Sequence, residues 1–258
     1  MGRELALQLL ERGARVAAVD INEEALAETS RLAAQRNSSW AENVAGFGLN
    51  ISEREAVRGF PDEVVERFGG VDGLINNAGV IQPMVKFSEL EFDQIDRVIN
   101  VNLHGVLNMT KAFLPHLLER SEAHIVNVAS MGGFLPVPGQ TIYGASKAAV
   151  KLFTEGLWSE LASTNVRVTV VFPGAINTDI AKNSGLADYQ EAMSDPERKA
   201  PPMTSADDAA RTIIEGMEAN SFRVLVGRDA RLMDRFYRFS PERATRLIYR
   251  QMRSILPE

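Results

Sequence analysis

A tyrosine and a lysine in the segment "IYGASKAAV" are spaced so that together they could do acid–base chemistry. Tyr143 and Lys147 are four residues apart, so on a helix their side chains lie on one face. A phenol titrates at about pH 10 and is a poor base at neutral pH, but a neighbouring ammonium favours the phenolate. We therefore expect Lys147 to lower the pKa of Tyr143, so that the phenol can exchange a proton with an alcohol or carbonyl oxygen.

A serine that follows an apolar run can act on the same oxygen. Ser130 ends the segment "HIVNVAS", and its hydroxyl can polarise a carbonyl by donating a hydrogen bond. Taken alone, a serine after a strand is a common turn residue, and a tyrosine four residues before a lysine is a common solvated helix face. Together these groups favour hydride transfer at a carbinol carbon.

The elements that must position these residues alternate along the chain. Short apolar runs predict strands at 15–19, 44–49, 73–75, 124–128, 166–172 and 223–226. Helical spacing of apolar residues predicts helices at 3–12, 23–36, 53–68, 92–118, 142–162 and 205–219. Several runs are apolar nearly throughout, as in parallel strands covered on both faces. The pattern predicts an α/β fold with a doubly wound, Rossmann-type parallel sheet, in one domain over 1–258.

The beginning of the sequence departs from this pattern. Gly2 is followed at once by a helical segment, whereas a doubly wound fold begins with a strand and a turn that carries the phosphate-binding glycines. We expect Gly2 to be the last of those glycines, at a helix N-terminus that faces a pyrophosphate. The first strand and most of the glycine-rich loop would then be missing from this sequence, and the natural protein would begin further upstream. The alternative is a truncated protein that binds no cofactor.

Composition excludes several classes of function. The net charge of −6 gives no support to a nucleic-acid partner, and the absence of cysteine removes disulfides and thiolate metal sites. The three histidines lack ligand spacing, so we expect no metal. No run of about 18 apolar residues and no secretory signal is present, which indicates a cytoplasmic protein.

Five motifs in the same order as in a known family extend this interpretation. "NNAG", "INVNLHG", "VNVAS", "YGASK" and "FPGAINT" follow one another along the chain, which thereby resembles the short-chain dehydrogenase/reductase family. The resemblance implies that Tyr143 is the catalytic acid/base, Lys147 its partner and Ser130 the polarising group. It also implies that Asn102 holds a water that links Lys147 to solvent.

The resemblance also implies a nicotinamide cofactor and a set of residues that contact it. The implied contacts at matching positions are Gly2, Asn77, Ala78, Gly79, Tyr143, Lys147, Pro173, Gly174, Ile176 and Thr178. Two features depart from the family pattern. The glycine loop is reduced to Gly2, and Asn50 replaces an acidic residue near the adenine, where its side-chain oxygen could still accept a hydrogen bond from the adenine amino group.

One residue predicts which nicotinamide cofactor is bound. It follows the strand at 15–19, which corresponds to the second strand of the family. Asp20 occupies this place, where a carboxylate can accept hydrogen bonds from both hydroxyls of the adenosine ribose. The same charge would repel a 2′-phosphate, so we expect NAD in preference to NADP. An NADP-preferring carbonyl reductase remains an alternative, because the missing loop could carry a basic residue.

The substrate pocket is predicted to be apolar. Its expected lining is Met131, Gly132, Phe134, Val137, Pro138 and Ile176, with residues 181–203 as a lid. No cluster of arginines indicates a phosphate or dicarboxylate. We therefore expect an oxidoreductase that transfers a hydride between NAD(H) and a lipophilic secondary alcohol or ketone. The alternative from another class is a non-catalytic scaffold of the same fold.

The end of the chain is basic, and the sequence leaves several surfaces on which it could pack. Residues 221–258 hold nine arginines against four acidic residues, and we expect 228–258 to form a helical extension. It could pack over the substrate pocket or on another subunit, and the less favoured alternative is an anionic membrane surface. The family resemblance implies a homotetramer or homodimer that uses the helices at 92–118 and 142–162.

Overall fold

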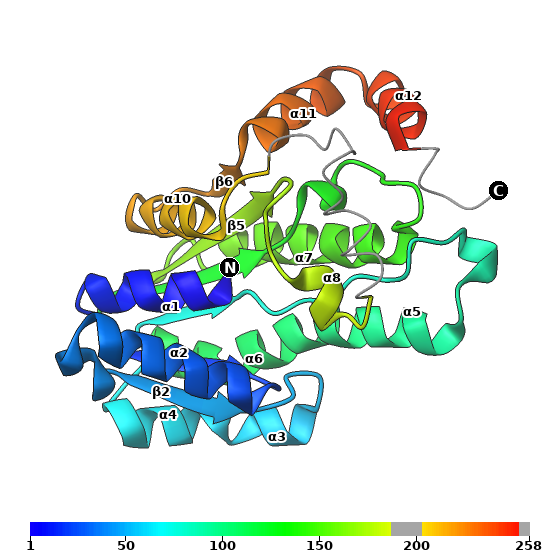
Figure 1. Ribbon diagram of the computed structural model, residues 1–258. Helices are drawn as coiled ribbons and strands as arrows, with labels where there is room; N and C mark the ends of the chain where they lie inside the picture. The colour runs from blue at the N-terminus through cyan, green and yellow to red at the C-terminus, as the bar shows by residue number, and fades with distance from the viewer. Residues whose placement is uncertain (187–202, 253–258) are drawn as a thin grey trace.

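The computed structural model describes residues 1–186 and 203–252, in which helices and strands alternate (Figure 1). The strands are β1 (Val16–Asp20), β2 (Val44–Gly48), β3 (Gly73–Asn76), β4 (Ala123–Val128), β5 (Val166–Pro173) and β6 (Arg223–Val226). The α-helices are α1 (Gly2–Glu11), α2 (Glu23–Arg36), α3 (Arg54–Arg58), α4 (Phe60–Phe68), α5 (Phe92–Ile99), α6 (Gly105–Leu118), α7 (Thr141–Glu160), α8 (Ile180–Asn183), α10 (Ala206–Glu218), α11 (Arg228–Phe239) and α12 (Pro241–Met252). Short 3₁₀ turns are η1 (Ser38–Ala41), η2 (Phe87–Glu89) and η4 (Met131–Gly133), and η3 (Asn100–His104) is a π-helical turn.

All strand pairs among the described residues are parallel, and the strands form two sheets. One sheet pairs β1 with β2, and the other has the order β3–β4–β5–β6. This confirms the predicted α/β class with a parallel, doubly wound arrangement. The described strands β1 and β3 are not paired with each other. A strand upstream of α1 stays a prediction.

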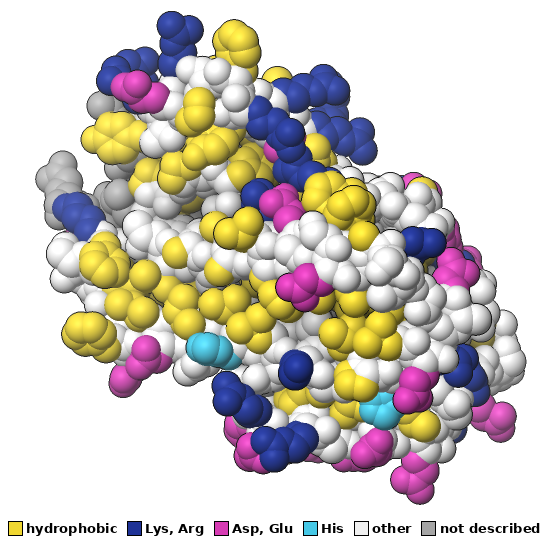
Figure 2. All heavy atoms as spheres, turned by 180° about the vertical axis from the view of Figure 1, so that it is seen from behind, with side chains coloured by type: hydrophobic (Ala, Val, Ile, Leu, Met, Phe, Trp, Pro, Cys, Tyr) yellow, Lys and Arg dark blue, Asp and Glu magenta, His cyan; other side chains and the backbone are white. Residues whose placement is uncertain are grey.

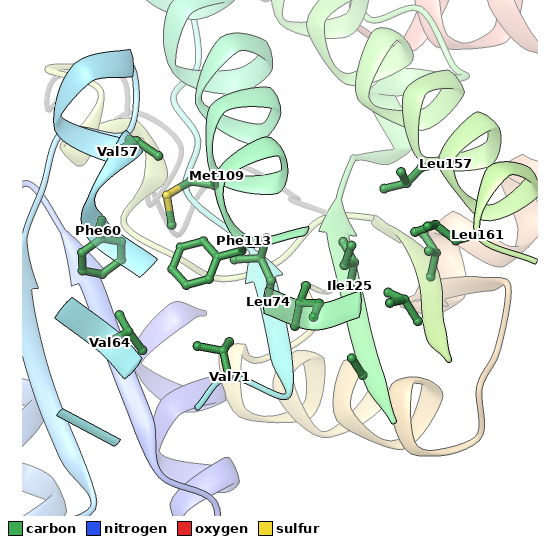
Figure 3. Close-up of a cluster of buried hydrophobic side chains, with 14 of the residues drawn as sticks. Val57, Phe60, Val64, Val71, Leu74, Met109, Phe113, Ile125, Leu157 and Leu161 are labelled. Atoms are coloured by element: carbon green, nitrogen blue, oxygen red, sulfur yellow. The ribbon is translucent and has the colours of Figure 1, made fainter. Parts of the chain in front are cut away.

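The larger sheet is covered on both faces. On one face, apolar side chains of α4, α6 and α7 pack on β3, β4 and β5, as the close-up in Figure 3 shows. Phe113 of α6 and Ile125 of β4 are both almost completely buried there. On the other face, α1 and α10 contribute Leu5 and Ile213 to a second cluster with Val171 of β5. Burial on both faces explains why these strands are apolar nearly throughout.

Two predicted helices are interrupted. The helix expected at 53–68 ends at Gly59 and starts again at Phe60, with Pro61 in the first turn of α4. Proline fits a first turn because the amide it lacks would have no partner there. The helix expected at 92–118 contains the π-helical turn η3 between α5 and α6. Apolar spacing alone does not distinguish such a turn from a continuous helix.

The basic end of the chain folds onto the loop that follows β4. Within the described residues, α11 and α12 form an apolar cluster with the loop residues Met131, Phe134 and Leu135. Asp234 of α11 accepts hydrogen bonds from Arg223 and Arg238, at 3.0 and 3.2 Å, which ties α11 to β6. The extension therefore lies over predicted pocket residues, and basic side chains gather over it (top of Figure 2). Residues 253–258 of the predicted extension lie outside the described residues.

None of the helices described here combines the length and the apolar character that crossing a bilayer requires.

Candidate active site

Helix α7 carries the predicted acid–base pair. Tyr143 lies in its first turn and Lys147 one turn later, where the lysine is only 3% exposed. The Nζ of Lys147 donates a hydrogen bond of 2.9 Å to the carbonyl oxygen of Val128, the last residue of β4. The lysine thus joins the catalytic helix to the strand that leads to Ser130.

Ser130 lies directly after β4, beside the tyrosine. Its hydroxyl lies near enough to the phenol of Tyr143 to lower the pKa of that phenol, and its Oγ accepts a hydrogen bond of 3.0 Å from the backbone N–H of Gly132. A side chain at Gly132 would begin 3.4 Å from both Ser130 Oγ and a ring carbon of Tyr143. The hydroxyl has a single O–H donor, which would turn from the phenol to a reacting oxygen when a substrate is bound.

The glycine after Gly132 permits the close approach of η4 to α7. A Cβ at Gly133 would lie 2.8 Å from the carbonyl oxygen of Lys147 and 3.2 Å from the amide nitrogen of Ala148. Any side chain at position 133 would therefore push the Ser130 turn away from the helix that carries Tyr143. The sequence analysis did not identify this role, although the paired glycines after Ser130 are a signal of close backbone approach.

Burial determines the protonation of the pair. Burial raises the pKa of the Tyr143 phenol, and the hydrogen bond from Ser130 lowers it by less. Burial also lowers the pKa of Lys147 to about 8. The predicted lowering of the tyrosine pKa by Lys147 is therefore wrong in this structure: desolvation disfavours the phenolate, and the Lys147 ammonium is held by a backbone carbonyl.

Asn102 lies in the π-helical turn and is fully buried. Its Oδ1 accepts a hydrogen bond of 2.8 Å from the N–H of Val80, and its Nδ2 donates to the carbonyl oxygen of Val80 at 2.9 Å. The same Nδ2 lies 3.1 Å from Ser146 Oγ, which donates to the carbonyl oxygen of Tyr143. The structure thus brings Asn102 to the catalytic helix, as a clamp between that helix and the loop after β3. That Asn102 holds a water that links Lys147 to solvent stays a prediction.

The loop after β3 contains a residue that the sequence analysis missed. Gln82 is fully buried, and its Oε1 accepts hydrogen bonds from the backbone N–H groups of Ile142 and Tyr143, at 2.7 and 3.0 Å. These are first-turn amides of α7. No local pattern could have identified this contact, because Gln82 and Tyr143 are 61 residues apart.

The ends of α1, β3 and α7 form a site that fits a nucleotide cofactor. A side chain at Gly2 would lie 2.8 Å from Asn77 Nδ2, and the Asn77 Oδ1 is buried with no hydrogen-bond partner among the described residues. A Cβ at Gly79 would lie 3.2 Å from both Asn102 Oδ1 and Lys147 Nζ. An unsatisfied buried acceptor and a cradle kept open by glycine are features that a bound polar group would complete. Ala78, between them, is exposed.

The predicted cofactor loop after β5 is held by an acidic residue that the sequence analysis also missed. Pro173 ends β5, and the N–H of Gly174 donates to the carbonyl oxygen of Val226 at 2.9 Å. The next amide, of Ala175, donates to Asp229 Oδ2 at 2.7 Å, and a side chain at Gly174 would collide with that carboxylate.

Beyond these residues, the same loop pairs with the segment that follows the undescribed residues. Ile176 forms a parallel bridge with Thr204, and Thr178 lies two residues further along, before α8.

Two predicted nucleotide contacts lie where the strands of the smaller sheet end, Asp20 at the end of β1 and Asn50 two residues after β2. Asp20 ends β1 with its side chain exposed, and its Oδ1 accepts a hydrogen bond of 2.9 Å from the N–H of Asn22, the residue that caps α2. Asn50 Oδ1 accepts hydrogen bonds from the N–H and Oγ of Ser52, at 3.1 and 2.7 Å. Asn50 thus forms a turn before α3, and its contact with adenine stays a prediction.

The predicted pocket lining is divided by the structure. Met131 and Phe134 join the apolar cluster under α11 and α12, and the Phe134 ring lies 5.6 Å from that of Phe172 and 6.2 Å from that of Tyr237. Val137 and Pro138 lie in the partly exposed loop before α7. Most of the predicted lid at 181–203 lies outside the described residues.

Known proteins are similar to this chain over most of its length. The family model described as short chain dehydrogenase matches residues 1–188. SadH of Mycobacterium tuberculosis, whose name describes it as an oxidoreductase, is 39% identical over 252 residues, which cover 96% of this chain and 90% of the relative.

Solved structures that contain NAD and others that contain NADP are similar to this fold. A short-chain dehydrogenase/reductase from Burkholderia phymatum in complex with NAD has a TM-score of 0.81 at 28% identity, over 93% of this chain and 89% of that chain. A short chain dehydrogenase from Burkholderia cenocepacia in complex with NADP has a TM-score of 0.74 at 27% identity, over 95% of this chain and 91% of that chain.

Proposed function

From the premise that this chain belongs to the short-chain dehydrogenase family, we propose that it transfers a hydride between NAD(H) and a lipophilic secondary alcohol or ketone. The chain is an NAD(P)-dependent oxidoreductase. The observation that carries the finer proposal is the placement of the Tyr143 phenol against the Ser130 hydroxyl, with Lys147 one turn further along α7.

The side chains divide the work of ketone reduction. The Ser130 O–H donates a hydrogen bond to the carbonyl oxygen and polarises the C=O bond. Tyr143, which burial keeps protonated at neutral pH, gives its phenolic proton to that oxygen as the carbonyl carbon becomes a carbinol. When bound, the nicotinamide supplies the hydride in reduction and accepts it in oxidation.

The same residues serve oxidation in reverse. The phenolate form of Tyr143 then takes the proton of the alcohol, so oxidation needs a higher pH than reduction. Lys147, from its place beside Gly79, stabilises the phenolate before the alcohol proton arrives, and in reduction it returns a proton to the phenolate that remains. Asn102 keeps the loop at Gly79 and Val80 against α7 through its hydrogen bonds to Val80.

Residues at the N-terminus of α1 and in the loops after β3 and β5 would hold the cofactor. Gly2 at the N-terminus of α1 would face the diphosphate, and the free acceptor of Asn77 would complete a polar contact. The loop from Pro173 to Thr178 would lie along the nicotinamide, held in place by Asp229.

The exposed carboxylate of Asp20 supports a preference for NAD. One of its oxygens accepts a hydrogen bond from the N–H of Asn22, and this bond orients the carboxylate at the end of β1. A fixed negative charge can accept hydrogen bonds from ribose hydroxyls and repels a 2′-phosphate.

The apolar cluster beside the catalytic serine supports a lipophilic substrate. Met131 follows Ser130 directly and packs with Phe134 against α11 and α12, which contribute Met233, Phe236 and Met252. Methionine and aromatic side chains adapt to apolar ligands and offer no charge to a polar one.

Exposed apolar residues on α5 and α7 support a homo-oligomer. Phe92, Leu152 and Trp158 are 82%, 68% and 45% exposed. Such residues are typical of subunit interfaces.

The test is a binding titration followed by a rate series. NADH fluorescence should change saturably on addition of the protein, and NAD-linked oxidation should become faster from butan-2-ol to decan-2-ol. The Ser130→Ala variant is the control, which should bind NADH equally and turn over slowly. Absence of NADH binding, or a preference for the shortest alcohol, would contradict the proposal.

A further inference from the structure

We propose that Gln82 is a positioning residue for the catalytic tyrosine: it caps the N-terminus of α7 from a distant part of the chain and thereby sets where the Tyr143 phenol lies. The inference rests on the proposed function only in assigning Tyr143 as the acid/base. The cap itself is a property of the described residues.

The first turn of α7 receives its cap from outside the helix. Helix N-termini leave backbone N–H groups without intrahelical partners, and a side chain of the N-cap residue commonly accepts from them. Here the N-cap residue, Gln140, makes no such bond. Gln82 Oε1 accepts from Ile142 and from Tyr143 itself, so one oxygen holds the amide of the catalytic residue and that of the residue before it.

Gln82 is held at both ends. Its own carbonyl oxygen accepts a hydrogen bond of 2.8 Å from Gln140 Nε2, so main chain and side chain both bind the start of α7. The two preceding residues are also anchored, Val80 to Asn102 and Ile81 to Ser184 Oγ at 2.9 Å. A loop fixed at three successive residues is a rigid support for a cap.

The hydrogen bonds also define the orientation of the amide. Two N–H donors converge on Oε1, so the reverse orientation would place an NH₂ group against two donors. The Nε2 of Gln82 has no partner among the described residues. A fully buried side chain with half of its hydrogen-bonding capacity unused is costly to keep, which indicates that the acceptor is what the position requires.

The experiment compares two variants at this position with a matched control. Gln82→Met keeps the shape and removes the acceptor, and Gln82→Glu keeps an acceptor oxygen at a helix N-terminus that favours negative charge. Gln8→Met is the control, because Gln8 is also buried and makes two side-chain hydrogen bonds, to Asp207 of α10, far from Tyr143 in the sequence. Octan-2-one reduction by NADH is the assay.

We expect Gln82→Met to lower kcat by about 10- to 100-fold with the KM for NADH unchanged, since a misplacement of about 1 Å can cost that much. Gln8→Met should lose thermal stability but keep its kcat. Gln82→Glu should recover most of the kcat, and its carboxylate beside Tyr143 should move the rise of octan-2-ol oxidation to higher pH by about 0.5 to 1 unit.

Three results would overturn the inference. They are a kcat of Gln82→Met within twofold of the parent protein, a kcat of Gln82→Glu as low as that of Gln82→Met, and an unshifted pH profile in Gln82→Glu. If Gln82→Met does not fold, the pH profile of Gln82→Glu decides.

A readout that needs no activity separates this inference from the proposed function. Amide hydrogen exchange at Ile142 and Tyr143 should be faster in Gln82→Met than in Gln8→Met or the parent protein. If the parent protein reduces no ketone, the proposed function fails while exchange still tests the cap. Unchanged exchange in an active protein would refute the cap alone.

Discussion

The two sheets of this molecule differ in how deeply they are buried. In β4 every residue but His124 is buried, and in β5 every residue but Arg167. In β1, by contrast, every residue is at least partly exposed, and in β2 only Val44 is buried. β4 and β5 are inner strands of their sheet, whereas β1 and β2 are the two edge strands of theirs, and the difference in burial follows this difference in position.

The catalytic groups and the cofactor-selecting group are divided between these two regions. Ser130 follows β4, and Lys147 is bonded to the last residue of β4, whereas Asp20 ends the exposed strand β1. Close-packed interiors transmit displacements and exposed strands absorb them. Substitutions around β3–β6 should therefore change the rate of the chemical step, and substitutions at β1 should change only which cofactor is used.

The largest effect is expected at the phenol. Tyr143→Phe removes the group that gives and takes the proton, so kcat for octan-2-one reduction should fall by about 10²- to 10⁴-fold, while NADH binding by fluorescence should be retained. Tyr249→Phe, at an exposed position on α12, is the matched control with an unchanged rate. A Tyr143→Phe rate within threefold of the parent protein would remove the assignment of Tyr143.

The pH dependence of the two directions is the second test. Burial raises the pKa of Tyr143, so the phenol is present at neutral pH and the phenolate only above that raised pKa. Oxidation should rise by about tenfold per pH unit below it, whereas reduction should be level at neutral pH. Reduction should fall once Lys147, with its pKa lowered to about 8, loses its charge.

The same pH profiles should be obtained with either nicotinamide cofactor, because both titrating groups are carried by α7 and the cofactors differ only at the ribose that Asp20 would contact. Oxidation as fast at pH 6 as at pH 9, measured by steady-state absorbance, would show that the phenol is already ionised. That outcome would support the expectation from the sequence that the pKa of Tyr143 is lowered.

The close approach of η4 to α7 provides a third test, of intermediate size. In Gly133→Ala the new methyl would meet the backbone at Lys147, so Ser130 must move from Tyr143 and kcat should fall by about 10- to 100-fold. Overpacking should also lower the free energy of unfolding by about 1–3 kcal/mol, measured by urea denaturation.

Gly156→Ala is the matched control for this test, because a Cβ at that position of α7 meets no atom within 4 Å. It should raise stability by about 0.5–1 kcal/mol and leave kcat unchanged. Equal rates in both alanine variants would show that the Ser130 turn adapts without loss.

Much of the fold could be predicted because local patterns determine it. The apolar runs at 124–128 and 166–172 correspond to β4 and β5 within a residue at each end, since strands buried on both faces leave a continuous apolar signal. The break at Gly59 was missed although Gly59 and Pro61 are visible in the sequence. The turn η3 was missed because a π-helical turn preserves the apolar character of the segment.

The site was predictable to the extent that its contacts are local. Tyr143 and Lys147 are on one helix, so their spacing brought them together. Gln82 and Asp229 act on backbone amides far away in the chain, and no spacing rule reaches across such distances. The direction of the tyrosine pKa was wrong for a related reason, because burial depends on the assembled fold and the sequence analysis weighed only the neighbouring charge.

The smallest effect, and the sharpest test of the division between the two regions, is expected at Asp20. Removal of its charge in Asp20→Ala should raise kcat/KM for NADP by about tenfold, because a carboxylate near the ribose repels a 2′-phosphate. With NAD, only KM should rise, since kcat depends on groups carried by β4 and α7. Asp93→Ala, an exposed acidic residue in the first turn of α5, should change neither cofactor's constants. A steady-state comparison of both cofactors decides: an unchanged preference would refute the role of Asp20. A large fall in kcat with NAD would instead show that the exposed sheet is coupled to the chemical step, and the division drawn from burial would fail.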